Sequence, residues 1–109
     1  MSIEVTSILQ FEEVIVTTPV VLVDFYADWC EPCKWLDSIL IEVEENLSGE
    51  VTILKINSEQ LFELVQNLQI MSVPVLLLYK NGLLIWRMNG FLTAIELTEK
   101  INSISRETS

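Results

Sequence analysis

Hydrophobic residues occur along this chain in short blocks that alternate between two kinds of spacing. Five blocks predict β-strands, at residues 2–5, 20–26, 51–56, 74–79 and 83–88. The block at 20–26 is almost continuously apolar and rich in β-branched residues, which is typical of a central strand covered on both faces of a sheet. Asn81-Gly82 predicts a tight hairpin turn between the last two strands.

The segments between these blocks predict four helices, at residues 7–16, 32–47, 59–68 and 93–105. Capping-box patterns at Ser7–Gln10 and Thr93–Glu96 predict where the first and last helices begin, and Asn57 and Gln60 are placed like a cap for the third. The resulting order, βαβαβαββα, predicts an α/β fold with helices on both faces of a central sheet. The sheet should be mixed, because the closing hairpin must be antiparallel.

Composition and charge limit the classes of function. A chain of 109 residues that is 50% hydrophobic predicts one folded domain over residues 1–109, with a short flexible tail at about 106–109. Its net charge of −10 disfavours nucleic-acid and anionic membrane partners, which attract Lys and Arg. The charge mainly promotes solubility, and steering toward basic partners is the alternative. Residues 1–11 lack the pattern of a targeting segment, so we expect a cytoplasmic location.

The chain's two cysteines, Cys30 and Cys33, lie between a predicted strand and a predicted helix. The Cys-x-x-Cys spacing brings two thiols within reach of a disulfide, and the N-terminus of a helix stabilises a thiolate at Cys30. Cys33, one turn further into the helix, should be more buried and less acidic. The alternatives are half of a zinc site, although the chain contains no His and no other Cys, or a purely structural disulfide.

Asp24 is the one charged residue within the apolar strand at 20–26. A lone buried carboxylate is costly, and burial raises its pKa. Such a group is either functional or, as the alternative, a structural aspartate held by hydrogen bonds.

Residues 23–34, V-D-F-Y-A-D-W-C-E-P-C-K, resemble the active-site segment of the thioredoxin family, V-D-F-W-A-x-W-C-G-P-C-K. Val73-Pro74 lies where that family carries its cis-proline, residues 80–82 (K-N-G) resemble its hairpin, and Gly90 matches a glycine after the last strand. Because these features keep the family's order and spacing, the resemblance covers essentially the whole chain and implies the thioredoxin fold.

The resemblance implies a protein-disulfide reductase that serves electron transport and cell redox homeostasis. Cys30 would attack the substrate disulfide and Cys33 would resolve the mixed disulfide, leaving a redox disulfide between them. Asp24 would act as a general base toward Cys33, and Lys55 matches the lysine that neighbours this carboxylate. The residues expected to contact the substrate are Trp29, Glu31, Pro32, Val73, Pro74 and Gly90.

No metal and no bound cofactor are implied for this reaction. The partners implied by the resemblance are disulfide-containing proteins and a thioredoxin reductase, and we expect the chain to act as a monomer. A second hypothesis is a thioredoxin-like adaptor or subunit in which the redox role is secondary. The presence of Cys30, Cys33, Asp24 and Pro74 favours the reductase, since an adaptor needs none of them.

Two departures from the family pattern bear on specificity. Glu31 replaces the usual glycine between the cysteines, and its charge should raise the pKa of the Cys30 thiol by roughly one unit. It should also disfavour acidic substrates. Trp35 and residues 71–73 predict an apolar rim around the site. The apolar residues at 61–65 are interpreted mainly as core, with a hydrophobic partner surface as the alternative.

Overall fold

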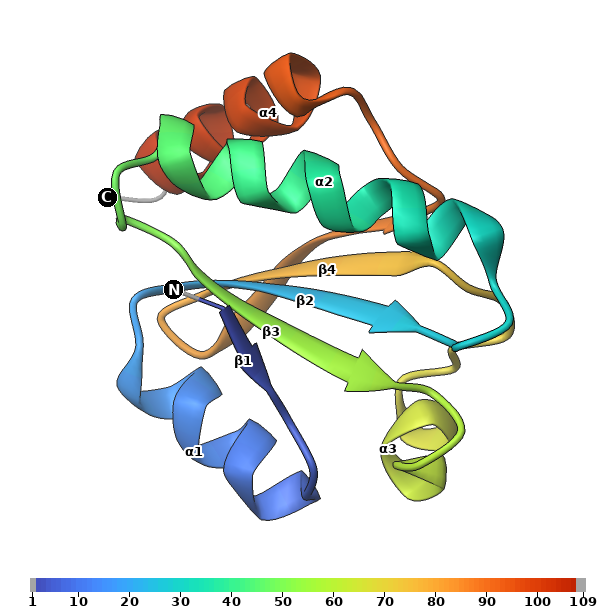
Figure 1. The fold of residues 1–109 in the computed structure, drawn as a ribbon. Coiled ribbons are helices and arrows are strands. Elements are labelled where there is room, and N and C mark those ends of the chain that lie inside the picture. Colours follow the sequence, from blue (N-terminus) through green and yellow to red (C-terminus); the bar gives the residue numbers. More distant parts are fainter. Residues whose placement is uncertain (1, 108–109) are drawn as a thin grey trace.

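The computed structural model describes residues 2–107 and places five strands in one sheet, in the order β1-β3-β2-β4-β5 (Figure 1). β1 runs parallel to β3 and β3 parallel to β2, whereas β4 is antiparallel to both β2 and β5. The predicted mixed sheet is therefore confirmed. The strands are β1 (Ser2–Glu4), β2 (Val20–Tyr26), β3 (Thr52–Asn57), β4 (Val75–Lys80) and β5 (Leu83–Asn89).

Two helices cover each face of the sheet. Figure 1 shows α2 and α4 above the sheet and α1 and α3 below it. The predicted order of helices and strands is confirmed, with most boundaries displaced by one or two residues. The helices are α1 (Ile8–Thr17), α2 (Glu31–Asn46), α3 (Phe62–Asn67) and α4 (Ala94–Glu107).

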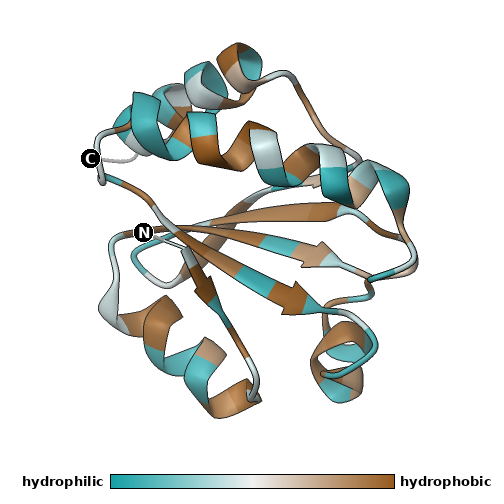
Figure 2. Ribbon diagram, viewed as in Figure 1, coloured by the Kyte–Doolittle hydropathy of each residue, from teal (hydrophilic) through white to brown (hydrophobic). Residues whose placement is uncertain are grey.

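The alternation of side chains along β2 separates the core into two layers. Val21, Val23 and Phe25 belong to the apolar cluster formed with α1 and α3, and Leu22 belongs to the cluster formed with α2 and α4. Because successive residues of a strand face opposite sides, Asp24 lies on the α2 side with Leu22. In Figure 2 most of β2, β3 and β4 is brown, and teal bands interrupt β2 and β3.

The capping patterns at the starts of the first and last helices are confirmed. The Ser7 hydroxyl accepts a hydrogen bond from the Gln10 backbone, and the Thr93 hydroxyl accepts one from the Glu96 backbone. The predicted end of the last helix near Ser105 is too early, because α4 continues to Glu107. Residues 106–107 of the predicted tail are therefore helical, and residues 108–109 lie outside the described residues.

The predicted start of the third helix is wrong. The Asn57 side chain does accept a backbone hydrogen bond, but the donor is Glu59, two residues ahead, and the Gln60 N–H bonds the Asn57 carbonyl. These bonds form a turn rather than a helix cap. α3 begins only at Phe62, after Leu61, which makes no side-chain capping bond. The later start leaves Phe62 exposed at the beginning of the helix.

The hairpin between β4 and β5 follows the sequence prediction. Asn81 and Gly82 have φ values of 50° and 85°, and a primed turn requires positive φ at both of its central residues.

Within residues 2–107, none of the helices combines the length and the apolar character that a bilayer crossing requires.

Candidate functional site

Cys30 and Cys33 lie at the point where β2 passes into α2. The backbone N–H of Cys30 donates to the Ala27 carbonyl at 3.2 Å, and Cys30 then serves as the N-cap of the helix. Its Sγ accepts a hydrogen bond from the Cys33 backbone N–H at 3.3 Å. Pro32 fits the first turn because the N–H groups there need no partner within the helix.

The two cysteines form a disulfide, with their Cα atoms 5.3 Å apart. Each residue is only 3% exposed, so the predicted difference in burial between Cys30 and Cys33 is absent in this oxidised form. Both are buried for the same reason, since Ala27, Tyr26 and Val73 pack around them. Elsewhere among residues 2–107, no three His, Cys, Asp or Glu side chains lie close enough together to hold a metal ion.

The segment before β4 faces the disulfide. The Val73–Pro74 peptide bond is cis, as the resemblance implied, and the Val73 carbonyl oxygen lies 3.8 Å from Cys30 Sγ. Gly90, at the end of β5, donates its backbone N–H to the Pro74 carbonyl at 2.8 Å. With φ at +107°, Gly90 adopts a backbone conformation that favours glycine. It therefore supports the Pro74 segment from behind.

Asp24 is completely buried on the α2 side of the sheet. Neither of its carboxylate oxygens accepts a hydrogen bond within residues 2–107, and Lys55 Nζ lies 3.6 Å from Oδ2. Burial raises the Asp24 pKa to about 7, and Lys55 only partly opposes that rise. Among the described residues, the charged neighbour of this buried carboxylate on β3 is therefore Lys55.

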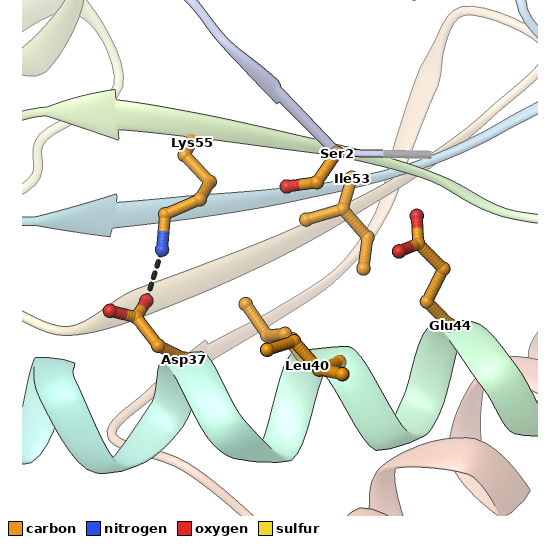
Figure 3. A pocket seen from close by; sticks show the side chains of 7 residues that line it. Ser2, Asp37, Leu40, Glu44, Ile53 and Lys55 are labelled. Carbon is orange, nitrogen blue, oxygen red and sulfur yellow. Dashed lines mark hydrogen bonds and ion pairs between the residues drawn. The ribbon is translucent and has the colours of Figure 1, made fainter.

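Lys55 reaches Asp24 because the two residues are direct neighbours in the β2–β3 register. Its ammonium group also donates a hydrogen bond to the Asp37 carboxylate on α2 (Figure 3) and lies 5.2 Å from the centre of the Tyr26 ring. Burial opposes the charge of Lys55, but Asp37 and Asp24 together hold its pKa above the ordinary value. Sequence reasoning found Lys55 and missed Asp37.

The four-residue spacing from Cys33 to Asp37 was the available signal for this residue. Side chains at positions i and i+4 of a helix lie on the same face, so an aspartate at 37 had to lie one turn from the second cysteine.

A further contact that the sequence did not reveal lies nearby, where the Tyr26 hydroxyl donates to Glu4 Oε2 at 2.6 Å. Burial and this bond raise the Tyr26 pKa.

Glu31 is exposed at the start of α2 and forms an ion pair with Lys34 at 3.3 Å. The lysine places a positive charge beside the carboxylate that was predicted to disfavour the Cys30 thiolate. Since both side chains are exposed, this pair contributes little to stability, but it offsets part of the negative charge of Glu31.

A groove of about 440 Å³ opens beside the disulfide. Its lining includes Val73, whose carbonyl faces Cys30, together with the apolar side chains of Trp29, Phe62 and Met71. Met71 is 93% exposed and Phe62 65%, so Met71 presents its apolar side chain at the surface as expected, and Phe62 adds a second apolar side chain. The apolar residues at 61–65 are divided, since Leu61 and Leu64 belong to the core and Phe62 belongs to the surface.

Trp35 extends the apolar rim on another side of the site. Its ring is 57% exposed and meets the ring of Phe91 edge-on, with the ring centres 6.0 Å apart. Aromatic pairs favour this arrangement, so the contact fixes the orientation of Trp35 at the surface.

The sequence and the fold of this chain were compared with those of known proteins. A family model described as Thioredoxin matches residues 2–103. Thioredoxin Y, chloroplastic, of Oryza sativa is 40% identical over 83 residues, which cover 76% of this chain and 49% of that protein. A thioredoxin-like protein of Synechocystis, slr0233, is 36% identical over 92 residues, covering 84% of this chain and 88% of the relative.

Two further similarities concern a bifunctional protein and a solved structure. The bifunctional thioredoxin reductase/thioredoxin of Mycobacterium leprae is 32% identical over 90 residues, covering 83% of this chain and 20% of that protein. The oxidised thioredoxin of Plasmodium falciparum has a TM-score of 0.83 at 27% identity, covering 96% of this chain and 99% of that one. The chain spans about half the length of the chloroplastic relatives it matches.

Proposed function

The chain belongs to the thioredoxin family, and on that premise we propose that it reduces protein disulfides by dithiol–disulfide exchange. The observation that carries the proposal is the Cys30–Cys33 disulfide at the start of α2. It lies against the Val73 carbonyl, and a buried carboxylate, Asp24, occupies the α2 side of the sheet. The redox pair and the buried carboxylate that the proposed reaction uses are therefore both present.

The reaction begins from the reduced pair. The Cys30 thiolate attacks one sulfur of the substrate disulfide, a bond forms between them, and the second substrate sulfur leaves with the electron pair. The position of Cys30 at the N-cap favours its negative charge, because the unpaired N–H groups and the helix dipole are both directed toward it.

The second step releases the substrate. Asp24 accepts the proton of Cys33, directly or through water, and the Cys33 thiolate attacks Cys30 Sγ. The bond between Cys30 and the substrate breaks, and the electron pair leaves on the substrate sulfur, which takes up a proton. The substrate has then gained two electrons, and Cys30 and Cys33 are oxidised to the disulfide present in this structure.

The groove beside the disulfide supports a proposal for the substrate. Trp29, Phe62 and Met71 offer an exposed apolar surface that leads to Val73 and Cys30. Substrate segments that carry apolar side chains next to the cysteine fit this groove. Glu31 and the net charge of −10 favour neutral or basic segments over acidic ones.

A thioredoxin reductase is the proposed electron donor. The family resemblance supports this partner, and so does the relative whose name joins reductase and thioredoxin. We place the chain in this cycle as a monomer that supplies electrons and maintains cell redox homeostasis. The cytoplasmic location stays a prediction, since several relatives are named as chloroplastic.

An adaptor role is the second candidate. The exposed apolar side chains of Trp35, Phe62 and Met71 favour it, because such surfaces commonly bind other proteins. An adaptor of this kind would bind its partner equally well without the cysteines.

An insulin-reduction assay tests the proposed function. Wild-type protein and the Cys30→Ser variant are compared, first with dithiothreitol and then with a thioredoxin reductase and NADPH as the source of electrons. We expect rapid reduction by the wild type and only the uncatalysed rate with the variant. Equal rates for the two proteins would reject the reductase and favour the adaptor.

A further inference from the structure

The Lys55 ammonium group is shared between two carboxylates that differ sharply in exposure. Asp24 is fully buried and lies 3.6 Å away without a hydrogen bond, whereas the half-exposed Asp37 accepts a hydrogen bond from Lys55 Nζ. Figure 3 shows Lys55 extending from β3 toward Asp37 on α2. The stronger contact of the lysine is thus with the surface carboxylate, and the buried one receives only part of its charge.

Asp37 is also the residue of α2 that connects this ion pair with the second cysteine. It lines a pocket of about 260 Å³ together with Lys55, and a second cavity of about 200 Å³ together with Cys33. Cys33 and Asp37 are four residues apart in α2, so they lie on the same helical face. Any change of charge at Asp37 therefore acts on both Lys55 and the surroundings of Cys33.

We propose that Asp37 is a positioning residue for the exchange reaction, which holds the Lys55 ammonium group away from a close ion pair with Asp24 and so keeps Asp24 basic enough to accept the Cys33 proton. This inference rests on the proposed function and adds a residue to it. Asp37 does not touch the reacting sulfur atoms in this role. It acts through the position and charge of Lys55.

The groups that the neighbouring strands and α2 place around Asp24 are consistent with this role of Asp37. β3 contributes Lys55, α2 contributes Asp37, and β1 contributes Glu4, whose charge also raises the Asp24 pKa. β4 contributes an apolar neighbour, Leu76, which pairs with Asp24 in the register. The Lys55 ammonium group is therefore divided between Asp24 and Asp37, and Glu4 adds a further negative charge near Asp24. Burial is the largest cause of the raised Asp24 pKa, and Asp37 adds to it.

An Asp37→Asn variant tests the proposal by removing the charge while keeping the size of the side chain. Without that charge, Lys55 is free to approach Asp24, and the direct repulsion between the two carboxylates is lost. Both changes favour the Asp24 carboxylate. We therefore expect its pKa to fall by about one unit, measured by carbon-13 NMR titration of the carboxyl group in the disulfide form.

The pH profile of the second step supplies the kinetic readout. In single-turnover resolution of a preformed mixed disulfide on Cys30, the midpoint of the profile should move to lower pH in Asp37→Asn by the same amount as the Asp24 pKa. Asp37→Glu should restore both values. The matched control is Glu44→Gln, which removes one acid from the same pocket two turns further along α2 and should leave both values unchanged.

An unchanged Asp24 pKa in folded Asp37→Asn would overturn the proposal, and so would an equal shift in Glu44→Gln. A second substitution, Asp37→Ser, provides the same comparison if the amide disturbs the helix. The titration requires no turnover, so its outcome is separate from that of the insulin assay. Inactive wild-type protein would reject the proposed function and leave the measured effect of Asp37 on Asp24 intact.

Discussion

Asp24 and Lys55 are direct neighbours on adjacent parallel strands, and Lys55 Nζ lies 3.6 Å from Asp24 Oδ2. Within residues 2–107, neither oxygen of this fully buried carboxylate accepts a hydrogen bond. A buried charge of this kind destabilises the fold unless it is paired and hydrogen-bonded. The protein therefore retains at its centre a group that opposes its own stability, which is the pattern expected of a functional residue.

Asp24→Asn should stabilise the protein at neutral and higher pH. The pKa of Asp24 rises from 3.8 to about 7 on folding, so the native state binds the proton more tightly and stability falls as pH increases between these values. A rise of this size corresponds to on the order of 4 kcal/mol once Asp24 is fully ionised. The variant, which cannot ionise, should avoid this loss.

Urea unfolding of the disulfide form at several pH values checks this prediction. The free energies of unfolding of wild type and Asp24→Asn should be similar near about pH 4 and should diverge in favour of the variant up to about pH 8. A difference between the two proteins that stays constant over this range would show that Asp24 is not responsible.

Glu31→Gly should lower the pKa of the Cys30 thiol. Lys34, the partner of Glu31 in the wild type, remains in this variant, so the whole repulsion from Glu31 is lost and the decrease should be about one unit. Lys34→Met should have the opposite effect, because it removes the compensating charge. The rate of thiol alkylation as a function of pH measures both shifts.

The control for these two variants is Glu42→Gln, an exposed position further along α2. It removes one negative charge from the same helix and should leave the thiol unchanged. If Glu31→Gly left the pKa of Cys30 where it was, or raised it, the predicted electrostatic role of Glu31 would be wrong.

Phe62→Ser and Met71→Ser should weaken the binding of protein substrates. Each removes an exposed apolar side chain from the groove beside the disulfide. Loss of about 1–2 kcal/mol of apolar contact corresponds to a roughly tenfold increase in KM. The rate with a small aromatic disulfide should not change, since such a substrate does not fill the groove.

Leu9→Ser is the matched control for the groove variants, because Leu9 is 74% exposed, between Phe62 and Met71, but lies at the start of α1. Its KM for the protein substrate should equal that of the wild type. A uniform increase in all three variants, or none in the groove variants, would contradict the proposed docking surface.

The fold was predictable because local patterns agree with one another along most of the chain. The apolar run at 20–26 and the turn at Asn81-Gly82 each permit few alternatives, and both form as expected. The start of α3 was not predictable in the same way. Asn57 suits a turn and a helix cap equally well, and the turn forms here, so the helix begins at Phe62.

The residues of the candidate site also differ in whether a local sequence pattern could identify them. Cys30, Cys33 and Val73-Pro74 belong to motifs that are read along the sequence, and the structure brings the disulfide and the Val73 carbonyl together. Asp37 belongs to the site because its carboxylate on α2 contacts Lys55 on β3. No local sequence pattern specifies how a helix packs over a particular strand. The position of Phe62 depended on the start of α3, so its exposure could not be predicted from its apolar character alone.

The most direct test of the account is the capture of a mixed disulfide. A Cys33→Ser variant is incubated with an oxidised protein substrate, and the products are analysed by mass spectrometry without reductant. We expect a covalent adduct joined through Cys30, released by dithiothreitol, and absent from the Cys30→Ser variant. No adduct with Cys33→Ser, or the same adduct with both variants, would contradict exchange through Cys30 and Cys33.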